Sequence, residues 1–160
     1  MSRGFIDILG TTELIERNRA AYDGLWASLY APPDQRYPKL EAAAKIWRSF
    51  YGDTTTFRWT FFAVNAGEAR RDCAQVGVAI ARYRAQQGHP PQTLDELVPG
   101  LLLELPRDPF NDEPLRYKSD AAGIVVYSVG PDGKDDAGRA LHGDGPSPEG
   151  DTAFHLAAQP

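Results

Sequence analysis

The sequence predicts an α+β fold, with helices first and a small antiparallel sheet last. Residues 11–87 contain three stretches with apolar side chains at helical spacing. Residues 115–156 contain three short runs rich in Val, Ile, Tyr and Phe, separated by turn residues. We expect residues 1–53 to form a helical N-terminal extension and residues 54–160 to form a helix-plus-sheet domain, with a single core as the working assumption.

Two helices are predicted in the N-terminal extension. The first runs from Thr11 to Tyr30, with Thr11 or Thr12 as its N-cap. The Pro-rich segment "APPDQRYP" breaks it, and the second helix runs from Lys39 to Phe50 and ends at Gly52. The extension is rich in aromatic residues, which we expect to seal a core; if several of them are exposed together, a partner or ligand groove becomes the better explanation. They are Tyr22, Trp26, Tyr30, Tyr37, Trp47, Phe50 and Tyr51.

The strongest periodic signal predicts a long helix over roughly 55–87. Its apolar stripe follows a 4, 3, 4, 3, 4, 3 spacing, and Gly88 followed by His89-Pro90-Pro91 ends it. The stripe consists of Phe62, Ala66, Ala69, Cys73, Val76, Ile80 and Tyr83. A coiled-coil partner is an alternative, but we favour a helix that covers the core of its own domain. Cys73 is then expected to be a small buried side chain with an unreactive thiol.

The C-terminal part predicts the sheet. Thr93 caps a short helix with Glu96 in a capping box. Asp108, which precedes a proline, is expected to fix a turn. The runs "LRYKS" and "GIVVYSV" form an antiparallel hairpin through the turn at 120–123, and "TAFHL" adds a third strand.

An acidic, Gly- and Pro-rich loop at 130–151 joins the last two strands. Its carboxylates are those of Asp132, Asp135, Asp136, Asp144, Glu149 and Asp151. Calcium takes six to eight oxygen ligands, which such a composition supplies, although a solvated loop could carry the same charge. An EF-hand is rejected because counting from Asp132 puts Lys134 at position 3 and Ala137 where the turn glycine belongs. A phosphate loop is disfavoured because the carboxylates would repel phosphate.

A resemblance favours the calcium interpretation. The segments "LPRDPF" at 105–110 and "YSVGPDG" at 127–133, following a long helix and "GHPP", are similar to the soluble domain of the type II secretion major pseudopilin, over about residues 75–156. The same combination is similar to uncharacterised bacterial proteins that carry this module without being pilins. The resemblance implies a structural domain stabilised by calcium, linked to type II secretion or a pilus-like assembly.

The resemblance also implies a ligand set. Asp132 matches the aspartate of the family's Ser-[Leu/Val]-Gly-x-Asp-Gly motif, and Asp151 matches the aspartate before its final strand. Ser128 would offer its backbone carbonyl, and Asp135 and Asp136 are added by proximity. A role for Asp144 or Glu149 is less well supported.

Other functions are disfavoured. The 17 basic and 22 acidic side chains form no basic stripe, so we expect no nucleic-acid partner. The histidines His89, His142 and His155 lack metal-ligand spacing, and no nucleophile motif is present, so we expect no enzyme and no catalytic residue. The alternative function is a binding module for a ligand or protein that uses the aromatic N-terminal helices, with the sheet as scaffold. Protein partners or self-assembly are compatible with both functions.

The sequence shows no signal peptide and no membrane span. Because structural calcium sites are best supplied outside the cytosol, we expect a periplasmic or cell-surface location if this chain is a piece of a longer protein whose anchor has been removed.

Overall fold

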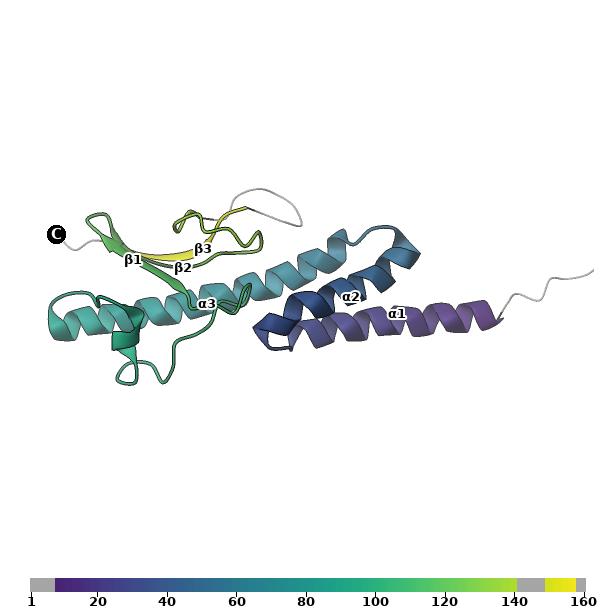
Figure 1. The fold of residues 1–160 in the computed structure, drawn as a ribbon, viewed down its shortest axis with the longest axis horizontal. Coiled ribbons are helices and arrows are strands. Elements are labelled where there is room, and N and C mark those ends of the chain that lie inside the picture. Colours follow the sequence, from purple (N-terminus) through teal and green to yellow (C-terminus); the bar gives the residue numbers. More distant parts are fainter. Residues whose placement is uncertain (1–7, 141–148, 158–160) are drawn as a thin grey trace, which may run out of the picture. The chain divides into compact units, whose positions relative to one another are not determined.

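The computed structural model describes residues 8–140 and 149–157, and it confirms the α+β class. Figure 1 shows helices α1 (Ile8–Leu29), α2 (Pro33–Tyr51) and α3 (Thr55–Gln87). They are followed by the short 3-10 helix η1 (Leu94–Leu97) and by strands β1 (Arg116–Asp120), β2 (Gly123–Ser128) and β3 (Thr152–Ala157). The chain divides into two compact units, residues 1–61 and 62–160. The sequence had placed a boundary earlier, after residue 53.

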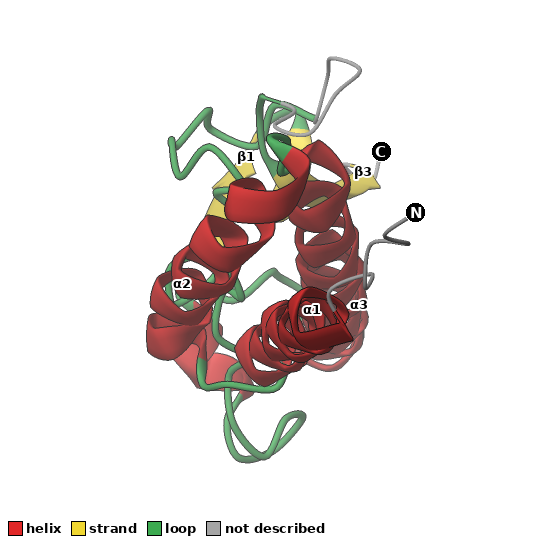
Figure 2. Ribbon diagram, turned by 90° about the vertical axis from the view of Figure 1, so that its right-hand side faces the viewer, coloured by secondary structure: helices red, strands yellow, loops and turns green. Residues whose placement is uncertain are grey.

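The first unit is built on the pair α1 and α2, which lie side by side (Figure 2). Gly24 of α1 permits their close approach, since a Cβ at this position would lie only 2.8 Å from the Cβ of Ala43. The buried side chains between these helices and the start of α3 are small or aliphatic apart from one phenylalanine. They are Leu25, Leu29, Leu40, Ala43, Ala44 and Phe61.

The ends of α1 and α2 partly correct the sequence prediction. Helix α1 already includes Thr11 and Thr12, so the prediction that one of them is its N-cap was wrong. Helix α2 starts at Pro33, before the predicted Lys39. A proline fits the first helical position because the N–H it lacks would have no partner within the helix. Gly52 ends α2 as predicted: its φ is 67° and its N–H donates to the Arg48 carbonyl at 3.0 Å.

The aromatic side chains of α1 do not seal the core of this unit, contrary to the expectation. Trp26 is 56% exposed and Tyr30 is 81% exposed, and their rings stack with an interplanar angle of 11°. Tyr22, also exposed, packs edge-on against Trp47 of α2. The physical reason is that Leu25 and Leu29 occupy the seam with α2. Tyr22 and Trp26, four residues apart, therefore share a different stripe of α1, and Tyr30, one residue beyond the end of the helix, continues it.

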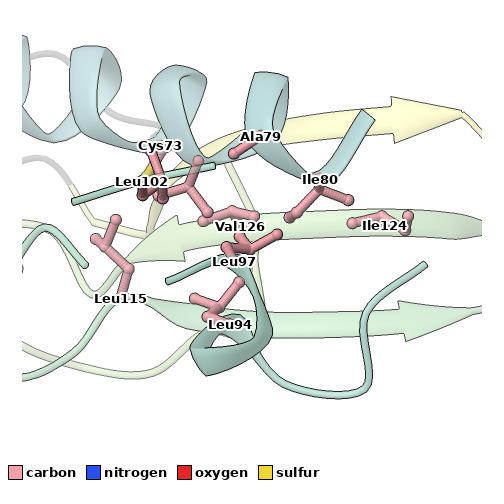
Figure 3. Close-up of a cluster of buried hydrophobic side chains, with 10 residues drawn as sticks. Cys73, Ala79, Ile80, Leu94, Leu97, Leu102, Leu115, Ile124 and Val126 are labelled. Carbon is pink, nitrogen blue, oxygen red and sulfur yellow. The ribbon is translucent and has the colours of Figure 1, made fainter. Parts of the chain in front are cut away.

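The second unit confirms the predicted long helix packed on a small sheet. The strands pair antiparallel in the order β1-β2-β3, and the sheet lies along α3 (Figure 1). Figure 3 shows α3 contributing Cys73 and Ile80 to a buried cluster with Ile124 and Val126 of β2. Leu94 and Leu97 of η1 close the same cluster. The apolar stripe of α3 is buried from Phe62 to Ile80, as the periodicity predicted.

Strand β2 is buried on both of its faces. Ile124 and Val126 belong to the cluster beside α3, while Val125 and Tyr127 point to the opposite, outer face because side chains alternate along a strand. The chain after β2 covers that outer face: a Cβ at Gly138 would lie 2.9 Å from Val125 Cγ2. The acidic loop therefore folds back over the sheet that precedes it.

The predicted capping box before η1 is confirmed. The Thr93 side chain accepts from the backbone N–H of Glu96, and the Glu96 carboxylate accepts from the N–H of Thr93 at 3.1 Å. The same carboxylate also accepts from the N–H of Gln92 at 2.6 Å.

In the part of the chain that the structure describes, no helix has both the length and the apolar character that a bilayer crossing requires.

Candidate functional site

The candidate site is the acidic loop between β2 and β3, of which residues 130–140 and 149–151 are described. It contains the predicted ligands Asp132, Asp135, Asp136 and Asp151, and it starts directly after Ser128 and Val129. Asp144 and His142 lie outside the described residues. Glu149 is exposed.

Asp151 fastens the end of the loop to its middle. Only 1% of this residue is exposed. Its Oδ2 accepts a hydrogen bond from the N–H of Gly138 at 2.7 Å, and its Oδ1 accepts one from the N–H of Asp136 at 3.4 Å. The backbone N–H of Asp151 donates in turn to the Arg139 carbonyl at 2.7 Å. Asp151 thus draws residues 136–139 against the entry to β3.

The electrostatics of Asp151 show that carboxylates gather here. Burial is the main cause that raises the pKa of Asp151 above its usual range, and the N–H groups of Gly138 and Asp136 oppose that shift. The negative charges of Asp135 and Asp136 raise the pKa further. The structure therefore brings three of the predicted ligands close enough to repel one another, and a cation would relieve that repulsion.

Local donors already balance part of this charge. Asp135 accepts hydrogen bonds from the Tyr127 hydroxyl and the Ala137 N–H, each at 3.0 Å, and Arg116 Nε lies 3.6 Å from it. Burial and then the bond to Asp135 raise the pKa of Tyr127 to about 12. Asp136 pairs with Arg139 at 3.1 Å. The Arg139 side chain is 68% exposed and the Asp135 carboxylate that faces Arg116 is 50% exposed, so water screens both ion pairs and they hold the carboxylates only weakly.

Asp132 contributes a buried carboxylate oxygen that lacks a hydrogen bond among the described residues. Its Oδ1 accepts from the N–H of Lys134 at 3.2 Å. Its Oδ2 is buried and, among the described residues, has no hydrogen-bond partner, although Lys134 Nζ lies 3.7 Å away as a distant ion pair. A buried carboxylate oxygen without a hydrogen bond is costly and calls for a specific explanation. A bound cation is one such explanation.

The acidic loop offers oxygen ligands, which are the type that a hard cation such as calcium prefers. Within residues 8–140 and 149–157, no three His, Cys, Asp or Glu side chains are arranged so that they alone could hold a metal ion. Calcium, however, also uses backbone carbonyls and water, so it does not need three side chains. Asp132 Oδ2 is the oxygen left open for it, whereas both oxygens of Asp151 already accept from backbone N–H groups.

Ser128 has a contact that sequence reasoning missed. Its hydroxyl donates to Oδ1 of Asp108 at 2.8 Å, and both residues are buried. The prediction that Asp108 fixes its own turn is confirmed, because Oδ1 also accepts from the Phe110 N–H at 2.9 Å. The Asp-Pro pair indicated the turn, but no local signal indicated a contact between residues 108 and 128.

Cys73 is also placed as predicted. It is completely buried, and its Sγ lies 3.6 Å from the Thr152 carbonyl at the start of β3. Burial, followed by the negative charge of Asp108, raises the pKa of the Cys73 thiol to about 12. The thiol therefore stays protonated at neutral pH.

Comparisons of this chain with protein-family models, with curated proteins and with solved structures found no match. The geometry by itself defines the class: an α+β protein in which a long helix lies on an antiparallel sheet and a buried aspartate closes an acidic loop.

Proposed function

We propose that this chain is a non-catalytic structural or interaction protein of the pseudopilin kind, in which calcium holds the acidic loop closed. A role in type II secretion or a pilus-like assembly is the function that the resemblance of residues 75–156 implies. The observation that carries the proposal is the buried Asp132 Oδ2, which has no hydrogen-bond partner among the described residues. The gathering of Asp135, Asp136 and Asp151 supports it.

Asp132 would bind the cation with the backbone carbonyl of Ser128 and water, while Asp135, Asp136 and Asp151, the other predicted ligands, would add negative charge rather than complete a set of side-chain ligands. When bound, calcium would supply positive charge and additional coordination, and so convert its binding energy into stability of the closed loop. Without it, like charges repel inside a loop that the Asp151 carboxylate holds by two hydrogen bonds and the Asp151 N–H by a third. The consequence is a loop whose order depends on the cation concentration.

The test compares thermal unfolding of the full chain in chelator, in calcium and in equimolar magnesium. At calcium about 100-fold above its Kd, binding adds about 2.7 kcal/mol to the free energy of unfolding, so the midpoint should rise. Magnesium should not reproduce the rise, because it demands near-ideal octahedral geometry and releases its waters reluctantly. Equal midpoints in chelator and in calcium would refute the proposal.

Two variants assign the effect to the loop. Asp132→Asn removes the charge at the open oxygen and should abolish most of the calcium-dependent rise. Glu104→Gln removes a charge from an exposed position of the same unit, outside the loop, and should leave the rise intact. Equal losses in both variants would show that calcium acts only through the net charge of the chain.

A second candidate function follows from the exposed aromatic stripe of α1. Tyr22 and Trp26 lie on one stripe of α1, Tyr30 follows directly after the helix, and each of the three is at least half exposed. Stacked, solvent-exposed aromatic rings provide large contact area at low conformational cost, and Trp and Tyr are enriched in interaction hot spots. The first unit would then be a binding module.

Self-association tests this second candidate without any further component. If the stripe binds a second copy, sedimentation velocity should show a concentration-dependent dimer, and a Trp26→Ser, Tyr30→Ser double variant should be monomeric. Replacing the exposed Val64 and Val78 of α3 by Ser serves as a matched control, because it also removes exposed apolar area. A chain that remains monomeric at all concentrations would refute self-association through the stripe.

A further inference from the structure

Asp108 is a buried carboxylate in the segment between η1 and β1. Only 1% of the residue is exposed. Its backbone is fixed on both sides: its N–H donates to the Glu113 carbonyl at 2.8 Å, and its carbonyl accepts from the Asp112 N–H at 2.9 Å. The carboxylate therefore projects from a turn whose backbone is closed within residues 108–113.

This single carboxylate controls the residues that lead into the acidic loop. Its Oδ1 accepts from the Ser128 hydroxyl at 2.8 Å, and its Oδ2 accepts from the Val129 N–H at 2.9 Å. The Ser128 Oγ in turn accepts from the Gly130 N–H at 3.1 Å. Hydrogen bonds to a carboxylate are stronger than neutral ones. Three successive residues at the exit of β2 are thus held directly or indirectly by Asp108.

These bonds also determine where backbone carbonyls point. In a trans peptide unit the C=O and the following N–H lie in one plane and point in opposite directions. Because the Val129 N–H is turned toward Asp108, the Ser128 carbonyl is turned away from it. In the same way, the Gly130 N–H bond to Ser128 Oγ orients the carbonyl of Val129. Carbonyl oxygens oriented toward the cation are the ligands that a calcium site needs besides its carboxylates.

We propose that Asp108 is a positioning residue for the calcium site: it holds the exit of β2 so that the Ser128 carbonyl is presented to the cation. Asp108 is not itself a ligand, because its two oxygens already accept three hydrogen bonds. This inference rests on the proposed calcium-binding function. It assigns a role in calcium binding to a residue outside the acidic loop, 20 residues before Ser128 in the sequence.

The test measures calcium affinity of the full chain by isothermal titration calorimetry. Asp108→Asn keeps one acceptor oxygen and replaces the other by an NH2 group, which cannot accept, so the N–H of either Val129 or Phe110 loses its acceptor. We expect its affinity for calcium to fall about 10- to 100-fold, the range found for residues that orient metal ligands. Asp112→Asn is the matched control, since it alters the same turn without touching Ser128 or Val129, and it should bind as the wild type does.

A second variant separates positioning from general stability. Ser128→Ala removes the hydroxyl that links Asp108 to Gly130. It keeps the backbone carbonyl of residue 128 and the hydrogen bonds that the N–H groups of Phe110 and Val129 donate to Asp108. Its calcium affinity should also fall, by less than in Asp108→Asn. Amide hydrogen exchange at Val129 and Gly130, measured in chelator, should accelerate in Asp108→Asn and not in Asp112→Asn.

The outcomes distinguish this inference from the function on which it rests. If the wild type does not bind calcium, the proposed function is wrong and Asp108 has no site to position. If the wild type binds calcium and Asp108→Asn binds it equally well, the positioning role alone is refuted. Should Asp108→Asn fail to fold, unchanged affinity in Ser128→Ala would refute it, and reduced affinity would support it.

Discussion

Phe154 of β3 packs directly against Gly77 of α3, and a Cβ at Gly77 would overlap the ring carbons Cδ1 and Cε1 of Phe154. Helix α3 can therefore approach β3 closely only because this position has no side chain. The contact joins a helix and a strand that are far apart in the sequence, and it lies beside the cluster that contains Cys73 and Val126.

Gly77→Ala is expected to destabilise the protein by about 1–3 kcal/mol, because the added methyl group forces Phe154 or the sheet to move. Alanine favours a helix over glycine by roughly 1 kcal/mol, which opposes this effect. Gly67→Ala, in the same helix, is the control: no described atom lies within 4 Å of its Cβ, so it should show only the stabilising effect. Urea unfolding measures the change in the free energy of unfolding for both variants. If both changes have the same sign, the packing argument is contradicted.

Gly138→Ala is expected to loosen the acidic loop. Gly138 has a φ of 84°, and a Cβ there would also press on Val125 at 2.9 Å. The left-handed conformation alone costs a residue with a side chain roughly 1–2 kcal/mol. Gly133→Ala carries only that cost, since its φ is 67° and its Cβ would meet no described atom within 4 Å. Gly138→Ala should therefore lower the free energy of unfolding more than Gly133→Ala does; the reverse order would mean that the loop does not cover Val125 in solution.

Leu97→Ala should be among the most damaging single changes in the second unit. Leu97 is completely buried in the cluster between α3 and the sheet, and such truncations cost about 2–5 kcal/mol. Leu103→Ala provides the comparison, because Leu103 is 93% exposed and its truncation should change stability by no more than about 0.5 kcal/mol. The denaturant midpoints of the two variants test whether Leu97 is buried and Leu103 is exposed. The midpoint should fall much further in Leu97→Ala than in Leu103→Ala.

The Cys73 thiol should resist labelling in the native protein. Because its pKa is raised to about 12, a thiol reagent at pH 8 should react only after denaturant is added. The unfolded thiol ionises near pH 8.5, so the unfolded state loses its proton first as pH rises. The stability that the neutral buried thiol contributes is therefore complete below about pH 8.5 and declines between that value and about pH 12.

Comparison with Cys73→Ala isolates this pH dependence. The difference in the free energy of unfolding between the wild type and Cys73→Ala should shift against the wild type from pH 7 to pH 10. A difference that is constant over this range, or rapid labelling of the folded protein, would show that Cys73 is accessible to water.

The local spacing of apolar and turn residues was sufficient to predict the long helix and the strands of the second unit. The 4, 3 spacing from Phe62 to Tyr83 predicted α3 over 55–87, and the structure has it at Thr55–Gln87. The hairpin turn at 120–123 and the run "TAFHL", which ends at Leu156, likewise predicted the strands that are found. The N-terminal helices were located less well: the prolines at 32 and 33 indicated a break, whereas Pro33 begins α2.

The sequence by itself therefore determined the helix and strands of the second unit, that Cys73 and Val76 face a core, and that Asp108 closes a turn. Each of these depends on side chains a few residues apart, whose relative positions a regular backbone already prescribes. Only the tertiary structure decided that Trp26 and Tyr30 remain exposed, that Asp151 bonds to Gly138, and that Asp108 reaches Ser128. These features depend on which surfaces meet when distant segments pack, and no local spacing encodes that choice.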